Sequence, residues 1–484
     1  MDTIKNMMNC DKCIQVLREE TPIESAVPVP ADKTLGAVLC VCPRLQVEET
    51  SVLEGRVKVN GTLALHIVAE DEERRLYCFD AAADFTHTLK GEDLTAGMQS
   101  QITAGLLSCE LRQEDGGLRL YALLGVTALI TQSVIVEAVS SLSGGRGVEQ
   151  KTRQVTGEKK LLLGAKSLRL REEEGVEEGT TLLGYTACLS PLQGETVGGS
   201  AAVEGTLCWE LLLLPPNGRM MKKTLRQPFT ETVAVQGAGE KDPFVRGEIT
   251  GLQAMIRGGA LLMEADVSLS IYGQRQETLI LLEDAYDETG SFSCEKGQTA
   301  CLCYKGSFAQ ELPVTGNLPI PSHMPECEEV LYSCGLPALK QAESGRAEGT
   351  LFVTTVYRCP QGLLHSFTRE IPFESMLPIE GTCAMAEVRV MELNVRGSGR
   401  TLNLDARVLV EGECYSQQTI AYTSGLKLQE PAPDYKGLML YFTEGGESFF
   451  SLGKQFHISL RDLQALNPGL KEPMEKGTQV LLLK

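Results

Sequence analysis

Sixteen cysteines give this chain its clearest potential for metal or redox chemistry. Only Cys10 and Cys13 stand at the Cys-x-x-Cys spacing, which suits one half of a zinc site or a redox pair. A structural zinc site needs four ligands, and Cys301 and Cys303 would complete one only through a long-range contact. We therefore interpret the cysteines as mostly buried, reduced thiols and keep a metal or redox role for Cys10 and Cys13 as the minor alternative.

The histidines give little sign of acid–base catalysis. Five are spread over well-separated segments: His66, His87, His323, His365 and His457. His66 lies within an alternating apolar segment and is expected to be packed rather than catalytic. The sequence lacks a Gly-x-Ser-x-Gly nucleophile turn, a phosphate-binding loop and a His-Glu-x-x-His motif. We therefore expect no enzyme activity, no catalytic residue, no metal site and no cofactor.

The elements of the chain follow from an internal repeat. The segment Gly61–Leu89 recurs without gaps as Gly205–Val233 and Gly349–Leu377, so equivalent residues are 144 positions apart. Three phenylalanines keep the same spacing: Phe85, Phe229 and Phe373. Most other side chains differ while apolar, turn and glycine positions persist. This pattern indicates one fold repeated three times.

Each recurring segment is predicted to be a β-hairpin. Apolar alternation flanks turns at Glu70–Arg74, Pro215–Gly218 and Cys359–Gly362. Its first glycine is expected inside a strand, at a bulge or a close backbone approach. Before each hairpin a short apolar strand carries a cysteine and is expected to stop at a proline: Val38–Leu45 with Pro43, Leu183–Leu192 with Pro191, and Leu331–Leu339 with Pro337.

A second strand pair follows in every repeat. The expected pairs are Ile102–Leu111 with Leu118–Thr131, Ile249–Ile256 with Leu261–Tyr272, and Val388–Val395 with Leu402–Val410. We count about six to eight strands in each repeat and almost no helix, which predicts a mainly β fold of three tandem antiparallel sandwiches or barrels. The sequence leaves open whether strands at the repeat boundaries are exchanged between neighbours.

The segments outside the repeats have other patterns. Residues 2–18 are predicted to form a short helix, and Thr21–Lys33 contains three prolines that indicate a linker or an edge strand. After the proline-containing Leu428–Lys436, the final segment has the order strand, helix, helix, strand. Ser459, with Asp462 three residues later, is the expected N-cap of the second helix. The expected divisions are 1–30, 31–148, 149–292, 293–428 and 434–484.

Length, charge and apolar content restrict the class of protein. The chain has 484 residues, 43% of them hydrophobic, and a net charge of −19. Such an acidic protein is a poor partner for nucleic acid or an anionic membrane. The sequence contains no secretion signal and no apolar run long enough to span a membrane, so the cell interior is the expected compartment. Glu70–Glu73 and Glu172–Glu178 are expected to be solvated turns, with attraction of basic partners as the alternative.

The last segment resembles a LysM domain. Gly446-Glu447-Ser448-Phe449-Phe450 stands where that family has Gly-Asp-Thr-Leu-Trp, and Leu463 to Pro468 matches its Leu-x-x-x-Asn-Pro. The resemblance implies a small α+β fold that binds N-acetylglucosamine polymers, chiefly peptidoglycan, in a groove between two loops. The implied groove residues in this chain are Gly446, Glu447, Ser448, Phe449, Phe450, Asn467, Pro468, Gly469 and Leu470.

Three β-rich repeats followed by one such segment are similar to the SPOCS-domain proteins of spore-forming clostridia. That resemblance implies a non-enzymatic morphogenetic protein of the spore coat, made in the mother cell and gathered on the forespore surface. It also implies binding to the ATPase of the coat basement layer, with the LysM domain contributing to that contact. The alternative is binding of peptidoglycan through the same groove.

Overall fold

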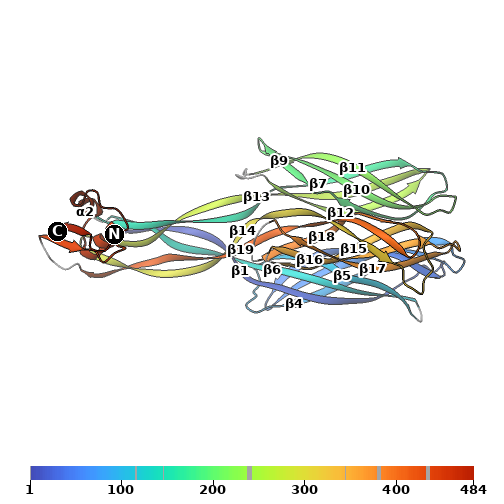
Figure 1. Ribbon diagram of the computed structural model, residues 1–484, viewed down its shortest axis with the longest axis horizontal. Helices are drawn as coiled ribbons and strands as arrows, with labels where there is room; N and C mark the ends of the chain where they lie inside the picture. The colour runs from blue at the N-terminus through green and yellow to red at the C-terminus, as the bar shows by residue number, and fades with distance from the viewer. Residues whose placement is uncertain are drawn as a thin grey trace.

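The computed structural model describes residues 2–114, 117–144, 147–236, 243–343, 345–378, 383–431 and 437–483. The fold is mainly β, as predicted, with only two short helices in the described part of the chain. Figure 1 shows a head of packed sheets, a long stalk of paired strands, and the C-terminal domain and N-terminus together at the far end of the stalk. Neither helix is long and apolar enough for a membrane span within the described residues.

Each repeat contains two antiparallel sheets that share one core; each sheet has three strands of its own repeat, except that the hairpin sheet of repeat two has a fourth, short strand. One sheet of each repeat comes from the hairpin and the strand before it. The strand orders in repeats one to three are β2 (Ala37–Leu53), β3 (Arg56–Glu70), β4 (Leu76–Lys90); β8 (Thr181–Leu189), β10 (Ser200–Leu214), β11 (Met221–Ala234); and β15 (Glu329–Glu343), β16 (Arg346–Arg358), β17 (Leu364–Met376). In repeat two the short strand β9 (Gln193–Val197) also pairs with β10. The three predicted hairpins are confirmed as β3 with β4, β10 with β11, and β16 with β17, and the predicted turns lie between their strands.

The other sheet of each repeat joins its first strand to its last strand pair. The orders are β1 (Asp2–Val27), β6 (Gly117–Ser143), β5 (Gln99–Glu114); β7 (Glu149–Gly175), β13 (Ala260–Asp287), β12 (Phe244–Arg257); and β14 (Gly290–Pro319), β19 (Thr401–Pro431), β18 (Cys383–Arg396). A short pairing of β13 with β14 at their shared turn joins the last two groups into one six-stranded sheet. Residues of both sheets lie in one apolar core in each repeat, so each repeat is a β-sandwich. Because the first strand of every repeat pairs along the last strand of the same repeat, the sandwiches exchange no strand among the described residues.

The glycine and phenylalanine of the recurring segment are cross-strand partners. Gly61 pairs with Phe85, and a Cβ built on Gly61 would lie 2.7 Å from the Phe85 ring atom Cζ. The pairs Gly205–Phe229 and Gly349–Phe373 repeat this arrangement. The ring covers the backbone where the glycine has no side chain, a device that fixes strand register. The predicted close backbone approach is therefore confirmed.

The stalk consists of three two-stranded ribbons. The pairing with the short strands β5, β12 and β18 stops at Thr131, Tyr272 and Tyr415 of the long strands. Beyond these residues, 132–143, 273–285 and 416–431 pair with the first strand of their own repeat, and Tyr286 and Asp287 also pair with β14 at the turn into repeat three. At about 3.3 Å per residue these ribbons extend roughly 40–50 Å from the head. Apolar side chains from different repeats close around each other inside the stalk: Met8, Cys10, Val136, Ala138, Leu281, Cys301 and Ile420.

The three sandwiches meet in the head around an approximate threefold arrangement. One shared apolar cluster contains residues at equivalent positions of the three repeats, in two triplets: Val68, Leu212 and Val356, and Leu39, Leu183 and Leu331. The inner sheets therefore contact each other through the same face in every repeat.

A buried charge joins all three repeats where the head narrows into the stalk. Glu413 of β19 is 2% exposed and forms an ion pair with Lys160 of β7. Its other carboxylate oxygen accepts hydrogen bonds from Gln101 of β5, at 3.1 Å, and from the Tyr415 hydroxyl, at 2.6 Å. Burial raises the pKa of Glu413, but Lys160 and the two hydrogen bonds outweigh it, so the pKa lies below its ordinary value.

Two predictions are wrong, one of a helix and one of where strands end. Residues 2–18 form no helix, because β1 pairs with β6 from Asp2 to Val27. Register shifts at Ile4/Lys5 and Cys13/Gln15 disrupt the alternation and leave a spacing that resembles a helix. Pro43 and Pro337 do not end their strands either, because β2 and β15 are edge strands in which a missing N–H can point away from the sheet. Of the segment Thr21–Lys33, the part up to Val27 belongs to the edge strand β1. The junction between repeats two and three is a short turn at the stalk tip, between the end of β13 at Asp287 and the start of β14 at Gly290.

Replacing Gly349 with alanine should destabilise the fold by about 1–3 kcal/mol, because the new Cβ would lie 2.5 Å from the Ala338 carbonyl oxygen and against the Phe373 ring. Urea unfolding followed by circular dichroism measures the effect. Gly157→Ala is the matched control, since a Cβ there meets no atom within 4 Å. Equal midpoints for the two variants would contradict the proposed role of the glycine.

Replacing Glu413 with glutamine should cost about 3–5 kcal/mol at neutral pH, because it leaves Lys160 buried without its counter-charge. Since the folded pKa of Glu413 is lowered, its stabilising effect is complete above the unfolded value of about 4.5 and is lost as pH falls through the folded value. Thermal unfolding should therefore show the two proteins converging below pH 4.5. A difference that is constant from pH 7 to pH 3 would exclude this linkage.

Candidate functional site

The C-terminal domain has the predicted strand–helix–helix–strand order. Its elements are β20 (Leu438–Phe442), α1 (Phe449–Phe456), α2 (Leu460–Leu466) and β21 (Gln479–Leu483). Ser459 caps α2, as expected, by accepting a hydrogen bond from the Asp462 N–H. Ser448 caps α1 in the same way by accepting from the Ser451 N–H. Residues 432–436 of the expected linker lie outside the described residues.

Two polar residues of the expected groove hold the loops of the domain. The Glu447 carboxylate accepts from the backbone N–H groups of Glu444 and Gly445, at 2.6 and 2.7 Å, and these bonds lower its pKa. Asn467 is buried: its amide donates to the carbonyls of Leu463 and Leu481, and its oxygen accepts from the Leu481 N–H. Both side chains are therefore committed to the fold.

The aromatic residues of the expected groove are also engaged. Phe449 is buried in the core of the domain, and Leu470 packs against the same core. Phe450 meets Tyr286 of β13 edge to face, with ring centroids 5.3 Å apart. Only Gly446, Pro468 and Gly469 are exposed among the nine expected residues, while Ser448 is half-buried at its cap.

Helix α1 docks on the tip of the stalk. The Tyr286 hydroxyl donates to the Ile458 carbonyl at 2.9 Å and occupies the space beside Gly453, where a Cβ would stand. Lys454 forms an ion pair with Asp284 at 2.6 Å, and the Leu460 N–H donates to Glu149. The C-terminal domain is therefore fixed to the ends of β7 and β13.

The outer face of the C-terminal sheet is apolar and exposed. Leu438 pairs with Leu483 and Leu440 with Leu481, so these side chains and Phe442 point to one face. Leu440 is 47% exposed and Phe442 54%. The opposite face carries Val480 and Leu482, which are buried against the helices. An exposed contiguous apolar face of this kind is typical of a contact surface.

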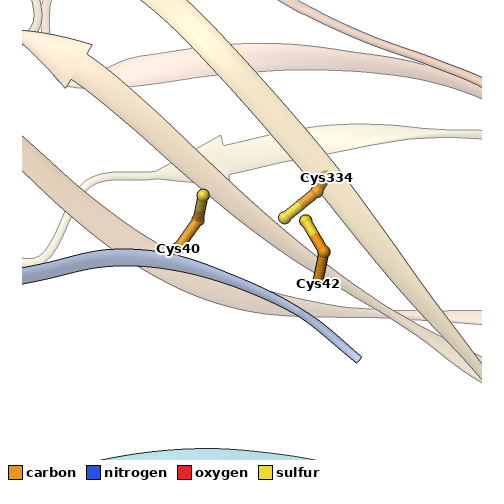
Figure 2. Close-up of side chains that lie close together, drawn as sticks. All are labelled: Cys40, Cys42 and Cys334. Atoms are coloured by element: carbon orange, nitrogen blue, oxygen red, sulfur yellow. The ribbon is translucent and has the colours of Figure 1, made fainter. Parts of the chain in front are cut away.

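A second candidate site lies in the head, where three thiols converge. Cys40 and Cys42 come from β2 of repeat one and Cys334 from β15 of repeat three, and their sulfur atoms all lie within 4.8 Å of one another. Figure 2 shows the three side chains projecting into one space from the two strands. The fifteen cysteines whose side chains the structure describes are free thiols. Thiol hydrogen bonds from Cys334 and Cys40, with the Tyr332 hydroxyl, hold the pKa of Cys42 well below its usual range despite burial.

The thiols form part of a polar layer around the approximate threefold axis. In repeat one Cys42 is the cross-strand partner of His66, in repeat two Thr186 is the partner of Glu210, and in repeat three Cys334 is the partner of Thr354. His66, Glu210 and Thr354 are equivalent residues, each 144 positions after the one before. The His66 ring lies between Asp80, 2.7 Å from Nδ1, and the Leu183 carbonyl oxygen, 2.6 Å from Nε2. It joins repeats one and two, so its predicted packing role agrees with the geometry.

A cavity of about 940 Å³ opens beside this layer, between the three sandwiches. Its wall includes Cys42 and Cys334 but also charged groups from every repeat, such as Arg44, Arg246 and Glu387. Arg246 and Glu387 form an ion pair at 2.6 Å. The cavity is therefore polar enough to hold water.

Of the cysteines that the sequence singled out, Cys10 makes a long-range contact with Cys301, and the three-thiol cluster of the head contains other cysteines. Cys10 hydrogen-bonds to Cys301 in the stalk, and that pair has no third ligand within reach among the described residues, while Cys13 belongs to neither group. The signal that was missed is the repeat itself: Cys42 and Cys334 occupy the same position in repeats one and three. Equivalent positions near an axis lie close together, whatever their separation in sequence.

Comparison of the chain with protein-family models, with curated proteins and with solved structures gives no match.

Replacing Gly453 with alanine should release the C-terminal domain from the stalk, because the Cβ would displace the Tyr286 hydroxyl and lie 2.9 Å from the Ile458 carbonyl oxygen. Hydrogen exchange should then accelerate at least tenfold in α1 and at the tip of β13. Gly157→Ala, in the stalk, serves as the control, because a Cβ there meets no atom within 4 Å and should leave docking unchanged. Unchanged exchange in the Gly453 variant would mean that this contact does not hold the domain.

Proposed function

We propose that this protein is a non-enzymatic assembly scaffold of the spore coat. In this proposal the three repeats are SPOCS domains and the C-terminal segment is a LysM domain that binds protein rather than glycan. Its partner is the ATPase of the coat basement layer, and the complex forms in the mother cell on the forespore surface. The repeats supply a rigid body and the stalk presents the C-terminal domain.

The observation that carries this proposal is the exposed apolar face of β20 and β21. Protein contacts are built around buried apolar and aromatic side chains, and Leu440 with Phe442 offers such a centre. The C-terminal domain that carries this face lies at the tip of the stalk, away from the head (Figure 1). A partner therefore reaches it without contacting the acidic sandwiches.

The same domain offers little for a sugar polymer. Glycan recognition needs free aromatic faces and free polar groups, but Phe449 is buried, Phe450 packs on Tyr286 and Asn467 is fully hydrogen-bonded. These contacts favour the protein partner over peptidoglycan, which remains the competing outcome of the test.

The test uses the full chain, with titrations against the coat-basement ATPase of the same organism and pelleting with purified peptidoglycan. Leu440→Ser with Phe442→Ser should weaken ATPase binding at least tenfold, since two central apolar contacts are lost. Both residues are exposed, so folding should be unaffected. Met255→Ser in the head is the matched control, being 43% exposed and remote from the tip.

If the Leu440→Ser, Phe442→Ser variant bound the ATPase as tightly as the natural chain, the apolar face would be excluded as the contact. Pelleting with peptidoglycan, without any affinity for the ATPase, would instead establish glycan recognition and overturn the scaffold proposal.

A further inference from the structure

The three-thiol cluster of the head has the composition of a metal site. Thiolates are the ligands that thiophilic ions prefer, and Cys40, Cys42 and Cys334 are close enough for one ion to contact all three sulfurs. Cys40 is 2% exposed, so the site is held inside the protein. The ligands come from two repeats, with Cys334 almost 300 positions from Cys42, so only the folded head assembles them.

We propose that Cys40, Cys42 and Cys334 bind one thiophilic divalent ion of the Zn²⁺ class, which links repeat one to repeat three. Binding exchanges thiol protons for the ion: each coordinating S–H releases its proton to solvent, and a metal–sulfur bond takes its place. Cys42 and Cys334 also line the central cavity, which leaves room for water or another small donor at a fourth position.

The surrounding charges favour a divalent ion over a monovalent one. Three thiolates with a divalent ion leave one negative charge, whereas a monovalent ion such as Cu⁺ leaves two in a buried site. His66 pairs across the sheet with Cys42, and its ring nitrogens face Asp80 and the Leu183 carbonyl rather than the thiols. Glu210, the equivalent residue of repeat two, is neutralised by Lys222 at 2.6 Å.

The other close thiols of the described chain do not compete for this assignment. Cys188 and Cys208 are direct cross-strand partners, and Cys10 meets Cys301, but each is a pair without a third ligand within reach. The head cluster alone combines three sulfurs with an adjoining polar cavity.

The test uses the full reduced chain after treatment with a chelator, titrated with Zn²⁺ against a chromophoric chelator. One equivalent of Zn²⁺ should bind with a dissociation constant on the order of 1 μM or lower. Co²⁺ bound in its place should show the charge-transfer absorption band that thiolate ligands produce. Cys42→Ser and Cys334→Ser should each weaken Zn²⁺ binding at least 100-fold. Cys294→Ser, on β14 in the stalk, should leave it unchanged.

A second measurement does not depend on variants. Zn²⁺ should slow the alkylation of Cys42 and Cys334, which line the cavity, as peptide mass mapping reports, and should raise the Tm of the natural chain. Three results would overturn the proposal: no uptake of Zn²⁺ by the folded chain, full uptake by Cys42→Ser, or a Cys42–Cys334 disulfide in the isolated protein with no uptake after its reduction.

Discussion

A two-stranded ribbon cannot bury both of its faces, and the architecture of this protein depends on that constraint. Each repeat extends its first and last strands well past the sandwich, so each would expose an apolar ribbon if it stood alone. Three ribbons solve the problem together, because side chains such as Met8, Leu281 and Ile420 close a common core. The repeats are therefore interdependent in the stalk even though each sandwich has its own core in the head.

Glu413 connects this arrangement to the head. A buried carboxylate needs a counter-charge and hydrogen bonds, and it obtains them from Lys160 of repeat two and Gln101 of repeat one. An apolar contact tolerates small displacements, whereas a buried ion pair with fixed donors does not. The charge therefore specifies how the three repeats are oriented where the ribbons leave the sandwiches.

Much of the fold could be predicted from the repeat, because comparing copies separates positions that matter from those that vary. The Gly61 and Phe85 spacing indicated a close approach, and the structure explains it as ring against backbone. The β1 strand was missed because its bulges break the period of two and only its pairing with β6 makes it a strand. The thiol cluster was missed because contact across an approximate axis has no counterpart in local spacing.

Both described ends of the chain lie at the stalk tip, since Asp2 pairs with Ser143 beside the turn into repeat two and the C-terminal domain docks on Tyr286. An affinity tag or fluorescent protein fused to either end would therefore stand next to the apolar face of β20 and β21 and obstruct it. The turn at Gly258, between β12 and β13, is a better place for a label, because a Cβ there meets no neighbour and the adjoining Ala260 pairs with Gly175, at the end of β7 away from the stalk. A reporter there would follow the protein in a cell from the opposite end of the molecule.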